Sequence, residues 1–187
     1  MMIDPKSAIN ISSLPNEQCF GCRACVSVCP LDCIQMAFDQ EGFAYPQVDE
    51  EVCNACRKCV QSCPGFNDIN REGTTQEPRF FAGHHESAHT RLKSSSGGLF
   101  TAFAEYFLFK GGTVYGAVYD FDRMAVHHSR ASDLEALAPM RKSKYVQSDT
   151  TRVFEMIKQD LRSGMPVLFT GTPCQVAGLH LTLKGRE

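Results

Sequence analysis

The sequence lacks the features that mark several large classes of protein. It contains no tryptophan, its formal net charge at pH 7 is only −2, and its longest apolar run, residues 99–109, is interrupted by Glu105. That run is shorter than the roughly 20 residues of a transmembrane helix, so no membrane span is predicted. Without an excess of Lys and Arg there is no electrostatic footprint for nucleic acid. Residues 1–14 lack the apolar stretch of a secretory signal, and a cytoplasmic location is expected.

Cysteine, in contrast, is abundant, with 10 residues in a chain of 187. Nine of them lie between Cys19 and Cys63, and the tenth is Cys174. In a reducing compartment, thiols gathered in this way indicate metal binding rather than disulfides. Zinc ribbons would use pairs of C-x2-C separated by longer loops, whereas the cysteines here form triplets followed by C-P.

The clustered cysteines form an internal repeat. Each copy has the spacing C-x2-C-x2-C-x3-C-P, and Arg23 and Val26 of the first copy recur as Arg57 and Val60 in the second. This spacing is typical of bacterial [4Fe–4S] proteins, in which the fourth cysteine of each run ligates the other cluster. It therefore predicts two [4Fe–4S] clusters, the first held by Cys19, Cys22, Cys25 and Cys63, and the second by Cys53, Cys56, Cys59 and Cys29.

Changes of composition along the chain predict a protein of the α+β class with two domains. A ferredoxin-like dicluster domain is expected over residues 10–66, a polar linker over 67–78, and an α/β domain over 79–187. The first domain should contain a hairpin whose strands flank Asp39–Gly42. In the second, strands are expected at 79–84, 113–119, 124–128 and 167–169, and helices at 99–110, 133–137, 153–162 and 175–183.

Two turns of small residues precede predicted helices in the second domain. They are residues 94–98, with the sequence SSSGG, and residues 170–175, with the sequence TGTPCQ. Backbone N–H groups in such turns can approach a phosphate at the N-terminus of a helix, which would suit a nucleotide-type cofactor. Plain strand–helix connections are the alternative interpretation.

Two further features are interpreted as structural. His85–His89 matches H-E-x-x-H, but its surroundings predict a loop rather than the helix that a zinc protease needs. Cys33 has no counterpart in the second repeat, where Asn67 stands, and it is expected to be a small buried hydrophobe.

Four segments follow the cysteine repeat in a definite order: SSSGGLFTA (94–102), GTVYGA (112–117), SKYVQS (143–148) and GTPCQVAGL (171–179). With the repeat, they resemble the coenzyme F-420 hydrogenase/dehydrogenase beta-subunit family. Members of this family bind a flavin, usually FAD, beside iron–sulfur centres, and pass electrons to or from a partner protein or a small acceptor. The resemblance implies a flavin site lined by Ser95, Ser96, Gly97, Gly98, Lys144, Tyr145, Gln147, Thr170, Gly171, Thr172, Pro173, Cys174 and Gln175.

The resemblance leaves some questions open. Cys174 could face the flavin or lie near a cluster, and use of the deazaflavin coenzyme does not follow from the family name. The second domain of the family continues past residue 179, so the resemblance implies that residues 79–187 are a partial α/β domain of flavin-binding type. We therefore expect a fragment or a shortened product with an impaired flavin site. The expected function is that of an oxidoreductase in which flavin connects one-electron clusters to two-electron chemistry. The alternative is a non-catalytic electron carrier with a docking or vestigial α/β domain.

Overall fold

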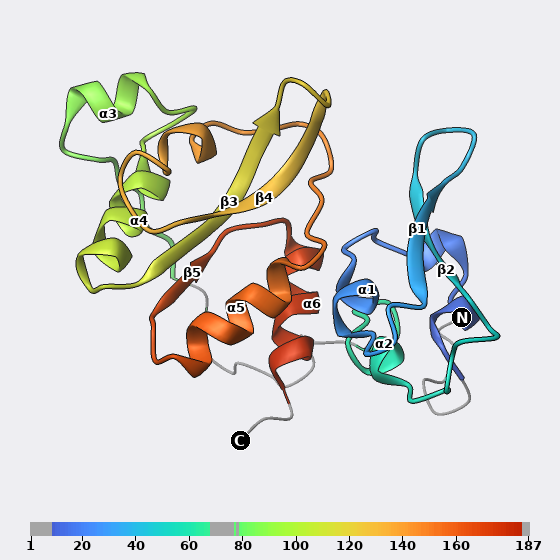
Figure 1. Cartoon of the computed structure of the whole chain (residues 1–187). Coiled ribbons are helices and arrows are strands. Elements are labelled where there is room, and N and C mark those ends of the chain that lie inside the picture. The colour runs from blue at the N-terminus through green and yellow to red at the C-terminus, as the bar shows by residue number, and fades with distance from the viewer. Residues whose placement is uncertain (1–8, 68–76, 78, 185–187) are drawn as a thin grey trace. The chain divides into compact units, whose positions relative to one another are not determined.

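A computed structural model describes residues 9–67, 77 and 79–184 (Figure 1). The chain divides into two compact units. The first, here the cysteine unit, comprises 1–73, 150–155 and 172–187, and the second, here the sheet unit, comprises 74–149 and 156–171. Both units contain helices, and each contains one sheet, as expected for the α+β class. The predicted linker lies almost entirely outside the described residues.

The cysteine unit is built from short elements. They are the 3-10 helices η1 (Ile11–Ser13) and η2 (Asn16–Gln18), the helices α1 (Ala24–Val28), α2 (Lys58–Gln61) and α6 (Pro173–Leu183), and the strands β1 (Ile34–Phe38) and β2 (Ala44–Val48). The two strands form the predicted antiparallel hairpin. Asp39 makes its turn, because its Oδ1 accepts hydrogen bonds from the N–H groups of Glu41 and Phe43 at 2.9 and 2.8 Å.

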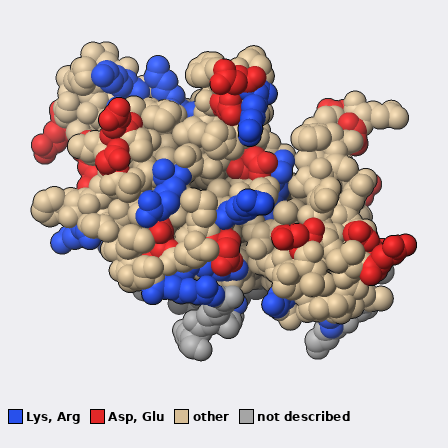
Figure 2. Space-filling view, in the orientation of Figure 1, with Lys and Arg blue, Asp and Glu red and all other residues tan. Residues whose placement is uncertain are grey.

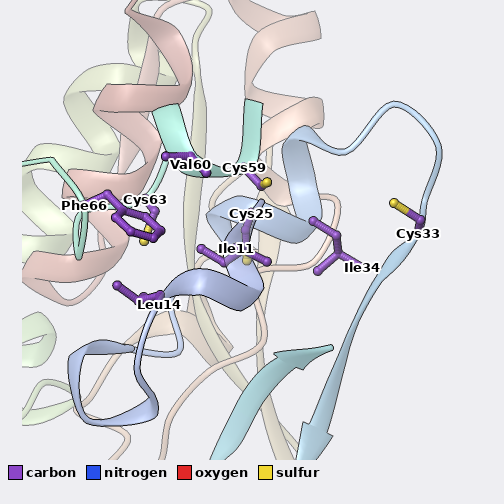
Figure 3. Close-up of a cluster of buried hydrophobic side chains, with 9 residues drawn as sticks. All are labelled: Ile11, Leu14, Cys25, Cys33, Ile34, Cys59, Val60, Cys63 and Phe66. Atoms are coloured by element: carbon purple, nitrogen blue, oxygen red, sulfur yellow. The ribbon is translucent and has the colours of Figure 1, made fainter. Parts of the chain in front are cut away.

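The core of the cysteine unit contains a high proportion of thiols. Its buried side chains are Ile11, Leu14, Cys25, Cys33, Ile34, Cys59, Val60, Cys63 and Phe66 (Figure 3). Cys33 is 7% exposed, which agrees with its prediction as a buried residue. A core with so few purely apolar side chains buries little hydrophobic surface, so the thiols and whatever they bind contribute much of the organisation of this unit.

The sheet unit is organised around β3. Its elements are α3 (Ala88–Leu92), α4 (Leu99–Phe109), β3 (Thr113–Asp120), β4 (Ala125–Ala131), η3 (Ala138–Met140) and β5 (Val167–Phe169), and α5 (Val153–Arg162) contributes residues 156–162. The strand order is β4-β3-β5, in which β3 pairs antiparallel with β4 and parallel with β5. The apolar run that begins β3 occupies the central position, where it is buried.

A buried carboxylate connects α5 to the sheet. Asp160 accepts hydrogen bonds from Thr113 Oγ1 and Tyr115 Oη, each at 2.8 Å. It also accepts from Nε and Nη2 of Arg130 at 2.8 and 3.2 Å. Burial alone would raise the pKa of Asp160, but these hydrogen bonds stabilise the carboxylate and lower the pKa below its ordinary value. The network is a structural ion pair, since every acceptor position faces a donor from β3 or β4.

Two predicted elements of the sheet unit are wrong. Residues 79–84 form no strand, and Phe80 and Phe81 are 89% and 82% exposed, so the apolar residues there pack on no sheet. Residues 133–137 form turns instead of a helix, in which Asp133 Oδ1 accepts from the N–H of Ala136 at 2.8 Å. The other predicted helices and strands are present within a few residues of the expected bounds.

The surface shows no dominant sign of charge on the face seen in Figure 2, where acidic and basic side chains are interspersed. Among the helices that the structure describes, none has the length and apolar character needed to cross a membrane.

Candidate metal centre

The two copies of the cysteine repeat share an unusual backbone conformation. Gly21 and Arg23 have φ angles of 63° and 60°, and their counterparts Ala55 and Arg57 have φ angles of 54° and 62°. A left-handed conformation costs a residue other than glycine about 1–2 kcal/mol. Such strain, repeated at equivalent positions, is typical of a functional site. The alternating left-handed residues curve each loop, as is needed when successive thiols bind one centre.

The first group of thiols lines a pocket of the cysteine unit. Cys19, Cys22 and Cys25 from the first loop meet Cys63 from the second around this pocket. Its empty volume is about 310 Å³, which includes space open to solvent. The structure brings together the four cysteines that the spacing assigns to the first cluster.

The second group also combines thiols from both loops. The Sγ atoms of Cys29 and Cys33 are 3.4 Å apart, and Cys33 interacts with Cys53 of the second loop as well. Cys59 is close enough to Cys53 and Cys56 for their charges to raise its pKa. Cys33 thus contacts both Cys29 of the first loop and Cys53 of the second.

Burial dominates the electrostatics of these thiols. It raises the pKa of Cys22 to about 12 and also raises the pKa values of Cys19, Cys25, Cys59 and Cys63. Thiolates in such surroundings need a positive charge beside them, which bound iron supplies.

Backbone N–H groups partly oppose this effect. Gly21 N–H donates to the sulfur of Cys19, and Ala24 N–H to that of Cys22. The sulfur of Cys59 accepts from the N–H groups of Ile11 and Val60, and that of Cys63 from those of Gly65 and Phe66. Soft thiol ligands with N–H donors directed at sulfur are the chemistry of iron–sulfur centres, so the residues present fit such a group.

A single metal ion fits the same residues less well. A tetrahedral zinc ion holds its sulfurs at about 2.3 Å, which places them about 3.8 Å from one another. Among the described residues, no three or more Cys, His, Asp or Glu side chains are gathered tightly enough to hold one ion. A cubane presents four separate corners, so its thiolates lie farther apart than those around a single ion.

The structure places Cys174 beside the first group of thiols. Cys174 Sγ lies 3.9 Å from the carbonyl oxygen of Phe20, and the charge of Cys174 contributes to the raised pKa values of Cys19 and Cys22. Of the two roles that the sequence left open, proximity to a cluster is the one for which the cysteine unit provides contacts.

Two further contacts hold residues 150–155 and 172–187 to the first loop. Thr150 Oγ1 donates to the carbonyl oxygen of Cys22 at 2.9 Å, and a Cβ atom at Gly178 would lie 2.8 Å from Ala24 Cβ. The change of composition along the chain predicts that these segments lie in the second domain, whereas they belong to the same compact unit as the cysteine repeat. No sequence signal marked Thr150 or Gly178, because their partners are more than a hundred residues away.

The candidate flavin residues fall in both units. In the sheet unit, Ser95 Oγ accepts from the N–H of Ser143 at 2.8 Å, which joins the turn 95–98 to the segment that contains Lys144, Tyr145 and Gln147. Lys144 Nζ donates to two carbonyl oxygens at 2.8 and 2.7 Å, and Tyr145 is 96% exposed. Thr170 and Gly171 also belong to the sheet unit, and Thr172, Pro173, Cys174 and Gln175 to the cysteine unit.

His128 supports the turn that follows β5. Its Nε2 donates to the carbonyl oxygen of Thr170 at 2.8 Å, its Nδ1 accepts from Ser148 Oγ at 2.9 Å, and its ring stacks on Phe169. Burial lowers the pKa of His128, which favours the neutral ring that these two bonds describe. No pattern in the sequence indicates this role of His128.

The H-E-x-x-H motif does not form a zinc site. His85 precedes α3, whereas His89 lies within it, so the two histidines do not share one face of a helix. His85 Nε2 pairs with Glu105 at 3.1 Å, and His85 Nδ1 accepts from the N–H of Ser87. His85 thus makes structural contacts, and His89 lies in a helix where the sequence predicts a solvated loop.

Comparison with known families agrees with the metal chemistry of the cysteine unit. The profile of the 4Fe-4S dicluster domain matches residues 18–66. No curated protein matches the chain. The chain thus contains an iron–sulfur domain of ferredoxin-like, metal-binding type, a kind of domain that transfers electrons.

Proposed function

We propose that the chain passes single electrons through two [4Fe–4S] clusters, held by the two sets of four cysteines defined above. The observation that carries this proposal is the pocket at which Cys63 joins Cys19, Cys22 and Cys25. Since Cys63 belongs to the other repeat, this is the gathering that crossed ligation requires. We propose residues 10–66 as the limits of this domain along the sequence and residues 79–187 as those of the second, of which 150–155 and 172–187 belong to the cysteine unit.

The clusters, when bound, supply one-electron chemistry at low potential. The chain contributes the surroundings that set this potential: buried sulfurs that exclude water, and N–H groups directed at them. Asn10 adds a side-chain donor, whose Nδ2 lies 3.9 Å from Cys53 Sγ and 3.0 Å from Glu50 Oε2. Glu50 orients the amide toward the sulfur.

The two clusters have different exposure in this proposal. Cys22 and Cys25 are buried, whereas Cys56 is exposed and Val52, next to Cys53, is 47% exposed. The second cluster would therefore exchange electrons with an external partner, because electron transfer requires close approach. The first cluster would be the inner centre, close to the turn that contains Cys174.

We also propose that a flavin, FAD by resemblance to the coenzyme F-420 hydrogenase/dehydrogenase beta subunits, accepts or supplies electrons at the turn 95–98 and at Thr170, both in the sheet unit. Two hydrogen bonds favour this proposal because they hold the turns in place: Ser143 N–H donates to Ser95 Oγ, and His128 Nε2 donates to the carbonyl oxygen of Thr170. In this form the protein is an oxidoreductase or its electron-transfer subunit, with a redox partner protein or a small acceptor. Lys144 Nζ already donates to two carbonyl oxygens of the chain, which leaves it less available to a flavin. This observation favours the second candidate function, an electron carrier without catalysis.

Anaerobic reconstitution with iron and sulfide tests the proposal. We expect about eight iron atoms per chain, from two four-iron clusters. Cys63→Ala should lose about half of this iron and the electron paramagnetic resonance signal of one cluster, whereas Cys174→Ala, the matched control, should retain both. Full iron in Cys63→Ala, or zinc in place of iron, would refute the crossed ligation.

A second measurement separates the two candidate functions. Denaturation of the reconstituted chain after incubation with FAD and desalting releases any bound flavin. One flavin per chain would support the oxidoreductase, whereas full iron without flavin would support the carrier.

A further inference from the structure

One of the two groups of thiols contains an additional cysteine. Cys33 Sγ lies 3.4 Å from Cys29 Sγ, and Cys33 also interacts with Cys53. In the second repeat, the corresponding residue is Asn67, whose Nδ2 donates to the carbonyl oxygens of Val60 and Cys63 at 2.7 and 2.9 Å. The repeat therefore places an extra thiol beside the fourth cysteine of one copy and an amide beside that of the other.

The local backbone brings Cys29 and Cys33 together. Pro30 follows Cys29, and Asp32 has a φ of 49°, so the chain turns sharply between the two cysteines. A disulfide needs its sulfurs about 2.05 Å apart, and the two Sγ atoms must therefore approach by about 1.4 Å. Rotation of the two side chains can supply a movement of this size.

An oxidant can reach this part of the cysteine unit. The second loop, which contributes Cys53 and Cys56 to the same group, has residues 54–56 exposed and Cys53 half-buried. By contrast, none of the four cysteines of the first group is exposed, since Cys22, Cys25 and Cys63 are buried and Cys19 is half-buried. Small oxidants therefore meet the second group first.

We propose that Cys29 and Cys33 are a peroxide-responsive thiol pair that forms a disulfide when the second cluster is lost. The released Cys29 thiolate takes an oxygen atom from hydrogen peroxide, which gives a sulfenic acid and hydroxide. The Cys33 thiol then attacks this sulfur, so that the S–S bond forms, the S–O bond breaks and water leaves. Overall, two thiols and one hydrogen peroxide give one disulfide and two waters.

The disulfide has two consequences. It prevents oxidation of Cys29 to the sulfinic acid, which thiols do not reverse. It also withholds one ligand of the second cluster until a dithiol reductant restores both thiols. The pair would thus make loss of the second cluster reversible. This inference rests on the proposed ligation of the second cluster by Cys29.

The test uses the full chain loaded with iron, treated with hydrogen peroxide and quenched by alkylation. Asp32 allows a sharp assignment, because digestion with trypsin and an Asp-N protease separates Cys29, in peptide 24–31, from Cys33, in peptide 32–38. We expect these two peptides to be linked, and fragmentation to place the bond at Cys29 rather than Cys25. A link from 32–38 to 49–57, which contains Cys53, or an alkylated Cys33 after iron loss, would overturn the proposal.

Two variants complete the test. Cys33→Ala should bind the same iron before peroxide but recover less than half of the lost iron after dithiol and iron are added, because Cys29 is over-oxidised. Cys174→Ala, which removes the other cysteine outside the ligand sets, should recover like the wild type. Equal recovery in both variants would contradict the protective role. A chain that never binds iron would instead refute the proposed function, so the two failures are distinguishable.

Discussion

Gly178 allows a direct test of how closely α6 packs on the first cysteine loop. A methyl group at this position would lie 2.8 Å from Ala24 Cβ and 3.3 Å from Cys22 Sγ, whereas carbon atoms normally approach to about 3.5 Å. Since Ala24 Cβ is fixed to the backbone of α1, one of the two helices must move by about 0.7 Å in the Gly178→Ala variant. Overpacking of this kind costs about 1–3 kcal/mol.

A second effect opposes the first. Alanine is about 1 kcal/mol more favourable than glycine in a helix interior, so an unhindered Gly→Ala change would stabilise α6. We expect the clash to dominate and the variant to be destabilised by about 1 kcal/mol, which lowers Tm by about 2–4 °C in a chain of this size. The displacement should also disturb the first cluster, because Cys22 lies at the contact.

Thermal unfolding of the iron-loaded chain under anaerobic conditions, together with the resonance signals of the two clusters, provides the measurement. Gly83→Ala is the matched control: its added Cβ would meet only Leu99 side-chain carbons at 3.7 and 3.9 Å, which is an ordinary contact. Its Tm and cluster signals should stay the same. A higher Tm in Gly178→Ala, with both clusters intact, would show that α6 does not pack on α1 as described.

Two further predictions concern strain and charge. Ala55 has a φ of 54°, so Ala55→Gly should relieve about 1 kcal/mol of strain and raise the urea midpoint; a lower midpoint would contradict this. Asp160→Asn should cost about 3 kcal/mol, because it leaves the guanidinium of Arg130 without its carboxylate. The hydrogen-bonded carboxylate has a lowered pKa, so its stabilisation is complete above the unfolded pKa of about 4 and is lost as the pH falls through the lower folded value. Unfolding followed by near-ultraviolet circular dichroism should therefore show a stability difference between wild type and variant that shrinks toward acid pH, and a constant difference would refute the assignment.

The parts of the fold that were predictable have local causes. The hairpin follows from alternating apolar residues around Asp39–Gly42, and α4 follows from apolar periodicity that ends at glycine. The repeated spacing of cysteines predicted that Cys63 of one loop would lie around the same pocket as the three cysteines of the other. The strand at 79–84 was wrong because apolar residues favour a strand only when a sheet is present to cover them, and Phe80 and Phe81 are exposed.

That the turn 172–175 belongs to the cysteine unit could not be predicted from the sequence, for a different reason. The contacts of α6 join residues more than a hundred positions apart, so no local pattern could assign the helix to the cysteine unit. These contacts also change how the motif GTPCQVAGL is interpreted. Gln175 Oε1 accepts from the N–H of Thr172 at 2.9 Å, Pro173 occupies the first turn of α6, and Gly178 allows the approach to Ala24.

Most residues of GTPCQVAGL therefore serve to begin α6 or to pack it on the first cysteine loop, and these roles require no contact with a cofactor. Cys174 is different, because a thiol is needed neither for the hydrogen bond that caps the start of α6 nor for the close approach of Gly178 to Ala24. Its position beside Cys19 and Cys22 makes it the residue of the motif that can connect the first cluster to whatever the turn binds. A change in the potential of the first cluster in Cys174→Ala, with its iron content unchanged, would identify that connection, and an unchanged potential would exclude it.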